Sequence, residues 1–175
     1  MGYWPEHIIE GERLDLSHVE PFQLNCYVKN LDRTLCLDVV FSNHCFTEAF
    51  KEGEHAPALK IMDGSSPRAF DRRRYALSAH LPGLVRSLPG AAVWQTPTER
   101  NYMYFMALID GSGRDYQMFF HLKKEKGSAD LRLRVESAYS VERAGALIKS
   151  STKVRFPVLC QKVFQNQLLR FHTKR

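Results

Sequence analysis

The sequence predicts an α+β domain with an N-terminal hairpin, one main amphipathic helix and a curved antiparallel sheet of about four to six strands. Two patterns predict this class. Apolar and polar residues alternate in several short runs, which is the period of a half-buried strand. One longer segment instead repeats its apolar residues at helical spacing. Strands on both sides of a single helix are typical of α+β domains, with helices on one face of the sheet and water or a ligand on the other.

The bulk properties fit one domain that spans residues 1–175. Hydrophobic residues make up 44% of the chain, enough for an ordinary core, and no run approaches the roughly 20 apolar residues that cross a bilayer. The N-terminus is acidic and lacks the apolar stretch of a signal peptide. We therefore expect a cytoplasmic protein with no membrane partner, in which the cysteines act as small apolar residues rather than as a disulfide framework.

The hairpin is predicted from two alternating runs, at residues 22–29 and 34–42, around the polar turn 30–33. Residues 1–20 are predicted to form an irregular arm. Residues 43–72 are rich in Gly, Pro, Ser, Asp and His, and they predict a long excursion with one short helix near 47–51. Long excursions in a compact domain are often functional.

The main helix is predicted over residues 72–88. Asp71 has the side chain of an N-cap, and Pro82 should kink or restart the helix because it lacks an amide donor. Pro89 and Gly90 should end it. The apolar stripe of this helix consists of Leu77, Leu81, Leu84, Val85 and Leu88.

The rest of the chain predicts an antiparallel meander, because short turns join one strand pattern to the next. Ser140 is expected to cap a short helix that runs to residue 148. The predicted strands cover 91–95, 102–109, 116–122 and 131–139, and a final hairpin covers 155–163 and 167–171.

Positive charge is concentrated at the C-terminal end. Residues 143–175 hold eight of the 25 Lys and Arg residues and no Asp or Glu. Apolar residues alternate through this segment, which predicts a folded element with one cationic side. Such a surface attracts a phosphate backbone. We therefore expect Lys153, Arg155 and Lys162 to bind nucleic acid, RNA rather than DNA, and we expect no metal or other cofactor.

Arg72, Arg73 and Arg74 open the predicted helix, where the helix dipole favours negative charge instead. This placement indicates an anionic partner, and we assign the three arginines to nucleic-acid binding. Alternatively, they form ion pairs with nearby carboxylates, for which the sequence offers Asp63, Asp71 and Glu99.

Arg132, Arg134 and Glu136 alternate within one predicted strand, so they project from the same face. Two guanidinium groups about 7 Å apart, with a carboxylate beside them, can clamp a phosphate and orient a base. Alternatively, they form the solvated outer face of a sheet. The same alternation puts Ser137 and Tyr139 on the inner face, where Tyr139 is either part of a site or a core residue with a hydrogen-bonded hydroxyl.

His44 directly follows a predicted strand, and a histidine there can act as a general acid or base near neutral pH. Alternatively, it is a partly buried structural histidine. Cys45 and His55 offer metal ligands, but the paired spacing of a zinc motif is absent. The sequence has no P-loop, GxGxxG, GxSxG, kinase or HExxH motif. This excludes the common nucleotide-dependent and hydrolase classes, though not small nucleases.

A helix at 72–88 followed by a sheet at 102–171 resembles the barnase-like and EndoU-like toxin ribonucleases. The runs RRRYALSAHLP, NYMYF and VESAY also look like those of small bacterial proteins linked to stress or mobile elements. The ribonuclease resemblance covers about the last 100 residues, rests on element order and leaves the N-terminal 70 unexplained. It implies metal-independent RNA cleavage with His, Arg, Lys or Tyr in the site, and it carries over no individual residue.

Three functions agree with these patterns. The first is a metal-independent endoribonuclease in which His44 takes the 2′-hydroxyl proton and Arg134 and Arg74 stabilise the phosphate charge. Tyr139 or Glu136 would complete proton transfer. The second is an RNA- or DNA-binding regulator without catalysis. The third is a protein–protein module of a mobile element, such as a toxin partner (antitoxin) or a defence inhibitor, whose basic face meets an acidic protein surface.

Overall fold

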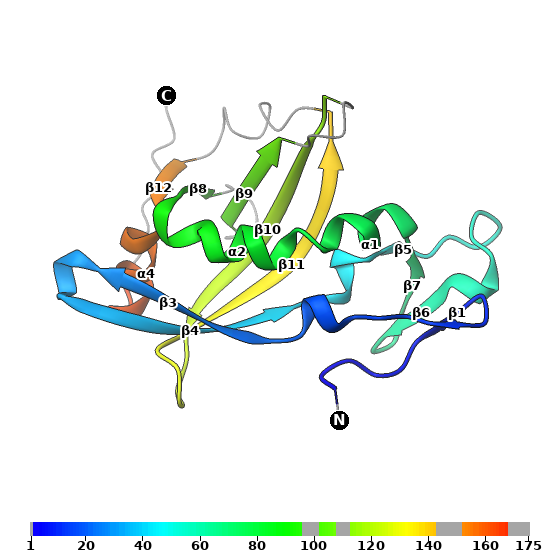
Figure 1. Cartoon of the computed structure of the whole chain (residues 1–175), viewed down its shortest axis with the longest axis horizontal. Helices are drawn as coiled ribbons and strands as arrows, with labels where there is room; N and C mark the ends of the chain where they lie inside the picture. Colours follow the sequence, from blue (N-terminus) through cyan, green and yellow to red (C-terminus); the bar gives the residue numbers. More distant parts are fainter. Residues whose placement is uncertain (1, 96–101, 108–112, 143–151, 168–175) are drawn as a thin grey trace.

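The computed structural model describes residues 2–95, 102–107, 113–142 and 152–167, which form a large sheet with helices on one face (Figure 1). This arrangement confirms the predicted α+β class. The seven strands of the large sheet, in spatial order, are β12 (Thr152–Arg155), β8 (Ala92–Gln95), β9 (Tyr102–Ala107), β10 (Asp115–Lys124), β11 (Leu131–Val141), β4 (Arg33–Phe41) and β3 (Phe22–Val28).

Strand pairing in this sheet is antiparallel except where β11 meets β4, which runs parallel to it from Leu131↔Leu37 to Val135↔Phe41. The predicted meander from β8 to β11 and the predicted hairpin β3–β4 are both present. The sheet exceeds six strands because this parallel pairing joins the hairpin to the meander. Figure 1 shows β3 and β4 crossing the other strands at a steep angle, so the sheet is strongly curved.

The core lies on the inner face of the large sheet, beneath α2 (Leu81–Ser87) and α4 (Phe156–Phe164). The rings of Phe120 on β10 and Phe156 on α4 lie 6.0 Å apart between their centroids. Burial of each such side chain contributes about 1.5–3 kcal/mol. The inner-face residues of β10 and β11, all buried, are Tyr116, Met118, Phe120, Leu122, Leu131, Leu133 and Val135.

The main helix is divided as its proline predicts. Asp71 caps α1 (Arg72–Ser78) by accepting hydrogen bonds from the backbone N–H groups of Arg73 and Arg74, at 2.9 and 3.1 Å. Pro82 lies in the first turn of α2, where its missing N–H leaves no helical hydrogen bond unmade. The short 3₁₀ helix η5 (Leu88–Gly90) follows.

The excursion after the hairpin does not contain the short helix predicted near residues 47–51, so this prediction is wrong. Its residues form a three-stranded sheet of β5 (Thr47–Ala49), β7 (Ser66–Phe70) and β6 (Lys60–Asp63), with β7 in the centre. Backbone pairing with β7 overrides the weak local helix preference of β5. Two 3₁₀ helices flank β5, namely η3 (Asn43–Cys45) before it and η4 (Pro57–Leu59) after it.

The N-terminal arm carries a small hairpin of β1 (Ile8–Ile9) and β2 (Glu12–Arg13), followed by η1 (Ser17–Val19). A last 3₁₀ helix, η2 (Lys29–Leu31), connects β3 to β4. No helix of the described residues has the length and apolar character needed to cross a membrane.

The first part of the predicted C-terminal hairpin, residues 155–163, is wrong because α4 occupies this segment. Phe156, Leu159 and Cys160 are buried at spacings of three and four residues, with Pro157 in the first helical turn. Ser140, the predicted cap of a short helix, lies inside β11. Residues 143–148 and 168–171, where a helix and the last strand are predicted, fall outside the described residues.

A β-bulge in β11 overturns the predicted inner placement of Ser137 and Tyr139. Phe119 of β10 pairs with Ser137, whereas the next residue, Phe120, pairs with Val135, so Glu136 is an extra residue in β11. Beyond Glu136, the alternation of inward and outward side chains in β11 is shifted by one residue. Tyr139 therefore stacks on Phe119 on the outer face, at 5.7 Å between ring centroids.

Replacement of Asp71 by Ala should destabilise the fold by about 1 kcal/mol, because two N–H groups of α1 lose their acceptor. Urea unfolding measures this loss. Asp71→Asn keeps a capping oxygen but loses the negative charge that faces Arg74 at 3.5 Å. It should cost only a few tenths of a kcal/mol, and an equal cost for both variants would contradict the capping role.

Candidate functional site

A depression of about 330 Å³ opens on the outer face of the large sheet, over β10, β11 and β4. We call it the outer-face pocket. Five of its lining residues are ionisable and come from the two central strands. The lining residues are Tyr3, Val40, His121, Lys123, Arg132, Arg134 and Glu136.

Strand register places the polar residues of this pocket. His121 on β10 lies opposite Arg134 on β11, and Lys123 lies opposite Arg132. The residues that alternate with them, Leu122 on β10 and Leu131, Leu133 and Val135 on β11, are buried, so strand alternation turns these four side chains outward. Strands paired on both sides hold a site more firmly than a loop does.

Two ion pairs partly neutralise the arginines of the pocket. Arg134 Nε donates to Glu136 Oε2 at 3.1 Å, and Arg132 Nη1 lies 3.5 Å from Glu125 Oε2. A guanidinium carries five N–H donors, so each arginine keeps donors for another anion. Arg132 Nε is buried without a hydrogen-bond partner in the described structure. Lys123 forms no ion pair with another described residue.

His44 lies beside the pocket and does not line it. Ser42 caps η3 by accepting from the His44 backbone N–H, and the His44 ring bonds Asp63 Oδ2 at 3.2 Å. Partial burial and the positive charge of Arg68 lower the pKa of His44, while Asp63 and Glu136 oppose this shift. The neighbouring Cys45 is fully buried, which raises its pKa to about 12 and makes it a poor nucleophile or metal ligand.

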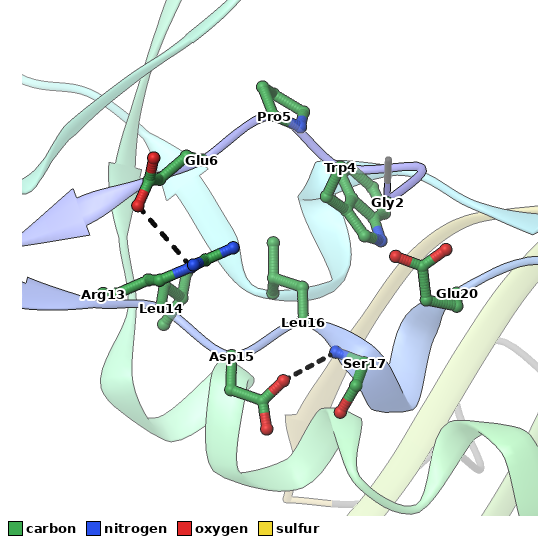
Figure 2. A pocket seen from close by; sticks show the side chains of 10 residues that line it. All are labelled: Gly2, Trp4, Pro5, Glu6, Arg13, Leu14, Asp15, Leu16, Ser17 and Glu20. Carbon is green, nitrogen blue, oxygen red and sulfur yellow. Dashed lines mark hydrogen bonds and ion pairs between the residues drawn. The ribbon is translucent and has the colours of Figure 1, made fainter.

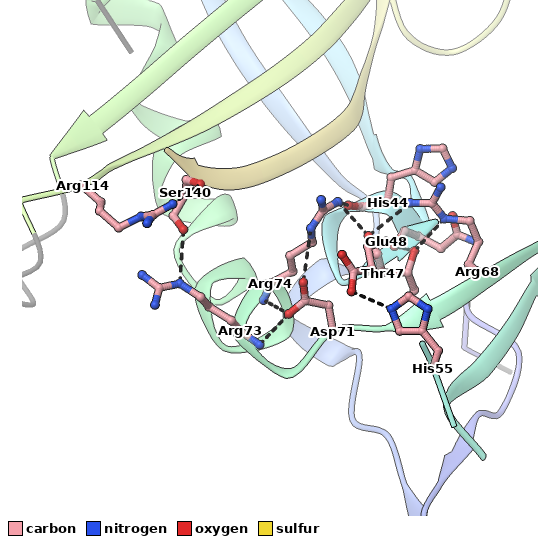
Figure 3. Close-up of polar contacts among 11 residues, drawn as sticks. His44, Thr47, Glu48, His55, Arg68, Asp71, Arg73, Arg74, Arg114 and Ser140 are labelled. Atoms are coloured by element: carbon pink, nitrogen blue, oxygen red, sulfur yellow. Dashed lines mark hydrogen bonds and ion pairs between the residues drawn. The ribbon is translucent and has the colours of Figure 1, made fainter. Parts of the chain in front are cut away.

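The arginines at the start of α1 are held by groups of the protein (Figure 3). Arg74 pairs with Asp71 at 3.5 Å, donates to the Thr47 carbonyl at 2.8 Å and lies 5.2 Å from the centre of the Tyr139 ring. Arg73 Nε donates to Ser140 Oγ at 3.2 Å. Arg72 pairs with Glu10. Asp71 is one of the carboxylates expected from the sequence to form ion pairs with these arginines, in the alternative to nucleic-acid binding.

The basic residues of the C-terminal segment do not gather on one face within the described part of the chain. Lys153 and Arg155 are exposed on β12, and the Lys153 ammonium lies 5.5 Å from the Trp94 ring centre. Lys162 lies on α4, on the inner side of the sheet. The other five basic residues of 143–175 fall outside the described residues.

A second depression, of about 370 Å³, lies in the N-terminal arm (Figure 2). Its carboxylates outnumber its cations, and protein groups engage them. Asp15 accepts from the Ser17 backbone N–H at 2.9 Å, and Glu6 lies 3.6 Å from Arg13. An anion would bind less readily here than in the outer-face pocket. No group of three metal-binding side chains occurs among the described residues.

Comparison with known protein families identifies the family of this chain. A family model described as "YjaZ family" matches residues 6–164. The chain belongs to the YjaZ family. The match includes every lining residue of the outer-face pocket except Tyr3. No curated protein and no solved structure matches the chain.

Of the residues predicted to be catalytic, this YjaZ-family structure brings Arg134 and Glu136 into one pocket, with His44 and Tyr139 outside its lining. His121 and Lys123 were missed. Their signal is present in the sequence, because alternation from Tyr116 to Leu122 turns them outward beside the arginine-bearing strand. Arg132, predicted to bind nucleic acid, also lines the pocket.

Substitutions around His44 should move its pKa in opposite directions. Asp63→Asn removes the negative charge that raises this pKa, so the value should fall further below 6.5. Arg68→Gln removes a positive charge that lowers the pKa, so the value should rise. NMR titration of the imidazole, assigned with His44→Asn, measures both shifts. Shifts of the same sign would contradict the described electrostatics, and His7 serves as a distant control.

Proposed function

We propose that the protein is a metal-independent endoribonuclease whose active site is the outer-face pocket. One observation carries this proposal: two paired strands present a histidine, a carboxylate and three cations to the same depression. Metal-independent RNA cleavage needs these groups, namely a base, an acid and cations that stabilise the phosphate. The resemblance of the element order to toxin ribonucleases points to the same chemistry.

In the proposed reaction, Glu136 accepts the proton of the ribose 2′-hydroxyl as the 2′-oxygen attacks phosphorus. The bond from phosphorus to the 5′-oxygen breaks, and protonated His121 donates its proton to that oxygen. The products are a 2′,3′-cyclic phosphate and a 5′-hydroxyl. Arg132, Arg134 and Lys123 stabilise the negative charge that builds on the phosphate oxygens. DNA has no 2′-hydroxyl and would not be cleaved.

This assignment revises the roles predicted for a nuclease from the sequence. Arg134 keeps its proposed role at the phosphate. Glu136 takes over the role of general base that the sequence assigned to His44, and His121 completes proton transfer in place of Glu136 or Tyr139. Arg74 is engaged by Asp71 and by the Thr47 carbonyl, so the proposal gives it a structural role in place of the role at the phosphate expected from the sequence. We also propose a cytoplasmic location, since all four cysteines are free thiols and reduced thiols are typical of that compartment.

A second candidate function is nucleic-acid binding without cleavage. The ion pair between Arg134 and Glu136, at 3.1 Å, favours it. The Arg134 guanidinium occupies an oxygen of the carboxylate that the cleavage reaction requires as a proton acceptor. This candidate predicts binding that weakens steeply with salt, as counterion release requires, and it predicts no cleavage product.

Replacing His121 by Ala or Glu136 by Gln should lower the rate of RNA cleavage by about 10²- to 10⁴-fold, the usual contribution of general acid–base catalysis. Purified protein with labelled single-stranded RNA measures this rate, and EDTA should leave it unchanged. His7→Ala and Glu12→Gln are controls, because neither residue lines the pocket. Full activity in both pocket variants would exclude these residues, and an inactive wild-type protein that still binds RNA would favour the second candidate.

A further inference from the structure

We infer that the outer face beside the pocket is a stacking surface for the bases of single-stranded RNA, formed by Trp94, Phe119 and Tyr139. The inference rests on the proposed function for the choice of RNA as the ligand. It goes beyond that function by naming the form of RNA and the residues that hold its bases. We call these three residues the aromatic surface.

The aromatic surface is continuous with the outer-face pocket. Phe119 is two residues from His121 on β10, so the two side chains project from one face about 7 Å apart. Tyr139 packs on Phe119 with an angle of 27° between the rings, and the Arg74 guanidinium lies 5.2 Å from the centre of the Tyr139 ring, so Tyr139 supports the Phe119 ring within this surface. The β-bulge at Glu136 causes this contact, because without it Tyr139 would point into the core.

Trp94 extends the surface across two further strands. It pairs in register with Met103 of β9, and Met103 pairs with Phe119 of β10. Residues directly opposite in a sheet share a face, and strands lie about 4.8 Å apart, which places Trp94 roughly 10 Å from Phe119. The adjacent Val93 and Gln95 are buried, as expected if Trp94 points outward.

The exposure of these aromatic residues is unusual for the outer face of a sheet. Trp94, Phe119 and Tyr139 are each half-buried, whereas outward positions of a solvated sheet are normally polar. Partly exposed aromatic rings on a rigid sheet are the platforms on which single-stranded bases stack. Bases inside a duplex are already stacked on one another and cannot reach such rings.

Cations flank the aromatic surface on both sides. Lys153 and Arg155 are exposed on β12 at one side, and Lys153 lies against the Trp94 ring. Lys123 and Arg134 lie at the other side, in the pocket. Aromatic rings between cationic borders complement a chain of bases on a phosphate backbone. The ligand that fits this pattern is a single strand that crosses β12, β8, β9 and β10 towards the pocket.

Tryptophan fluorescence tests this inference directly, because the chain has two tryptophans, Trp4 and Trp94. Trp4→Phe leaves Trp94 as the sole reporter. A short 2′-O-methyl single strand serves as the probe, since it lacks the attacking hydroxyl and stays intact. Its binding should quench the emission of Trp94. In the reciprocal variant Trp94→Phe, the emission of Trp4 should not change.

Binding of the same probe should weaken by on the order of 5- to 150-fold in Trp94→Leu and in Phe119→Leu, the range expected for loss of one stacked base. The 2′-O-methyl duplex should bind no differently to wild type and variants. Tyr27→Leu is a matched control, because Tyr27 is 55% exposed on the distant edge strand β3. Circular dichroism and thermal melting confirm that each variant is folded.

The outcomes separate this inference from the proposed nuclease function. Unchanged affinity in both leucine variants, with no quenching of Trp94, would overturn the aromatic surface even if His121→Ala abolishes cleavage. Weaker single-strand binding with quenching would support the surface even if His121→Ala leaves cleavage intact. Equal losses of duplex and single-strand affinity would also overturn it, because stacking on these rings requires unpaired bases.

Discussion

The fold depends on strand β11, which must keep an apolar core on one face and a charged surface on the other while paired on both sides. β10 binds it antiparallel and β4 binds it parallel. On the inner face, Leu131, Leu133 and Val135 are fully buried. On the outer face, Arg132 and Arg134 lie opposite Lys123 and His121. The register that buries the core therefore also assembles the polar pocket, since a slip of one residue would exchange the two faces.

The end of the parallel pairing organises the segment around His44. β4 leaves β11 after Phe41, and the backbone N–H of Ser42 then donates to the Val135 carbonyl at 2.9 Å. η3 then lies beside β11 in place of β4, and Cys45, the last residue of η3, is buried. The bulge at Glu136 directly follows the last residue of β11 that pairs with β4. The alternation of inward and outward residues in β11 therefore shifts at the position where this pairing ends. This coincidence puts Glu136 within electrostatic reach of both His44 and Arg134.

Local patterns predict the parts of this fold that local physics decides. The alternation of β3 and β4, the cap at Asp71 and the break at Pro82 depend only on neighbouring residues, and all three are confirmed. The strand at β5 and the parallel pairing of β4 with β11 depend on partners 19 to 94 residues away, which no local window contains. The helix α4 was missed although Phe156, Leu159 and Cys160 follow helical spacing, because strand-like alternation overlaps it.

The position of each charge matters more to the candidate site than the count of basic residues. Arg72 and Arg74 belong to a conspicuous cluster, yet carboxylates of the arm and of the cap hold them. Arg134 is also paired, but its partner Glu136 is the proposed base. In the proposed reaction, a phosphate that binds the Arg134 guanidinium would compete with this ion pair and release the carboxylate beside the 2′-hydroxyl. Under that proposal, the 3.1 Å contact between Arg134 and Glu136 would hold the carboxylate until a substrate binds, which would reconcile a partly neutralised pocket with a polyanionic substrate.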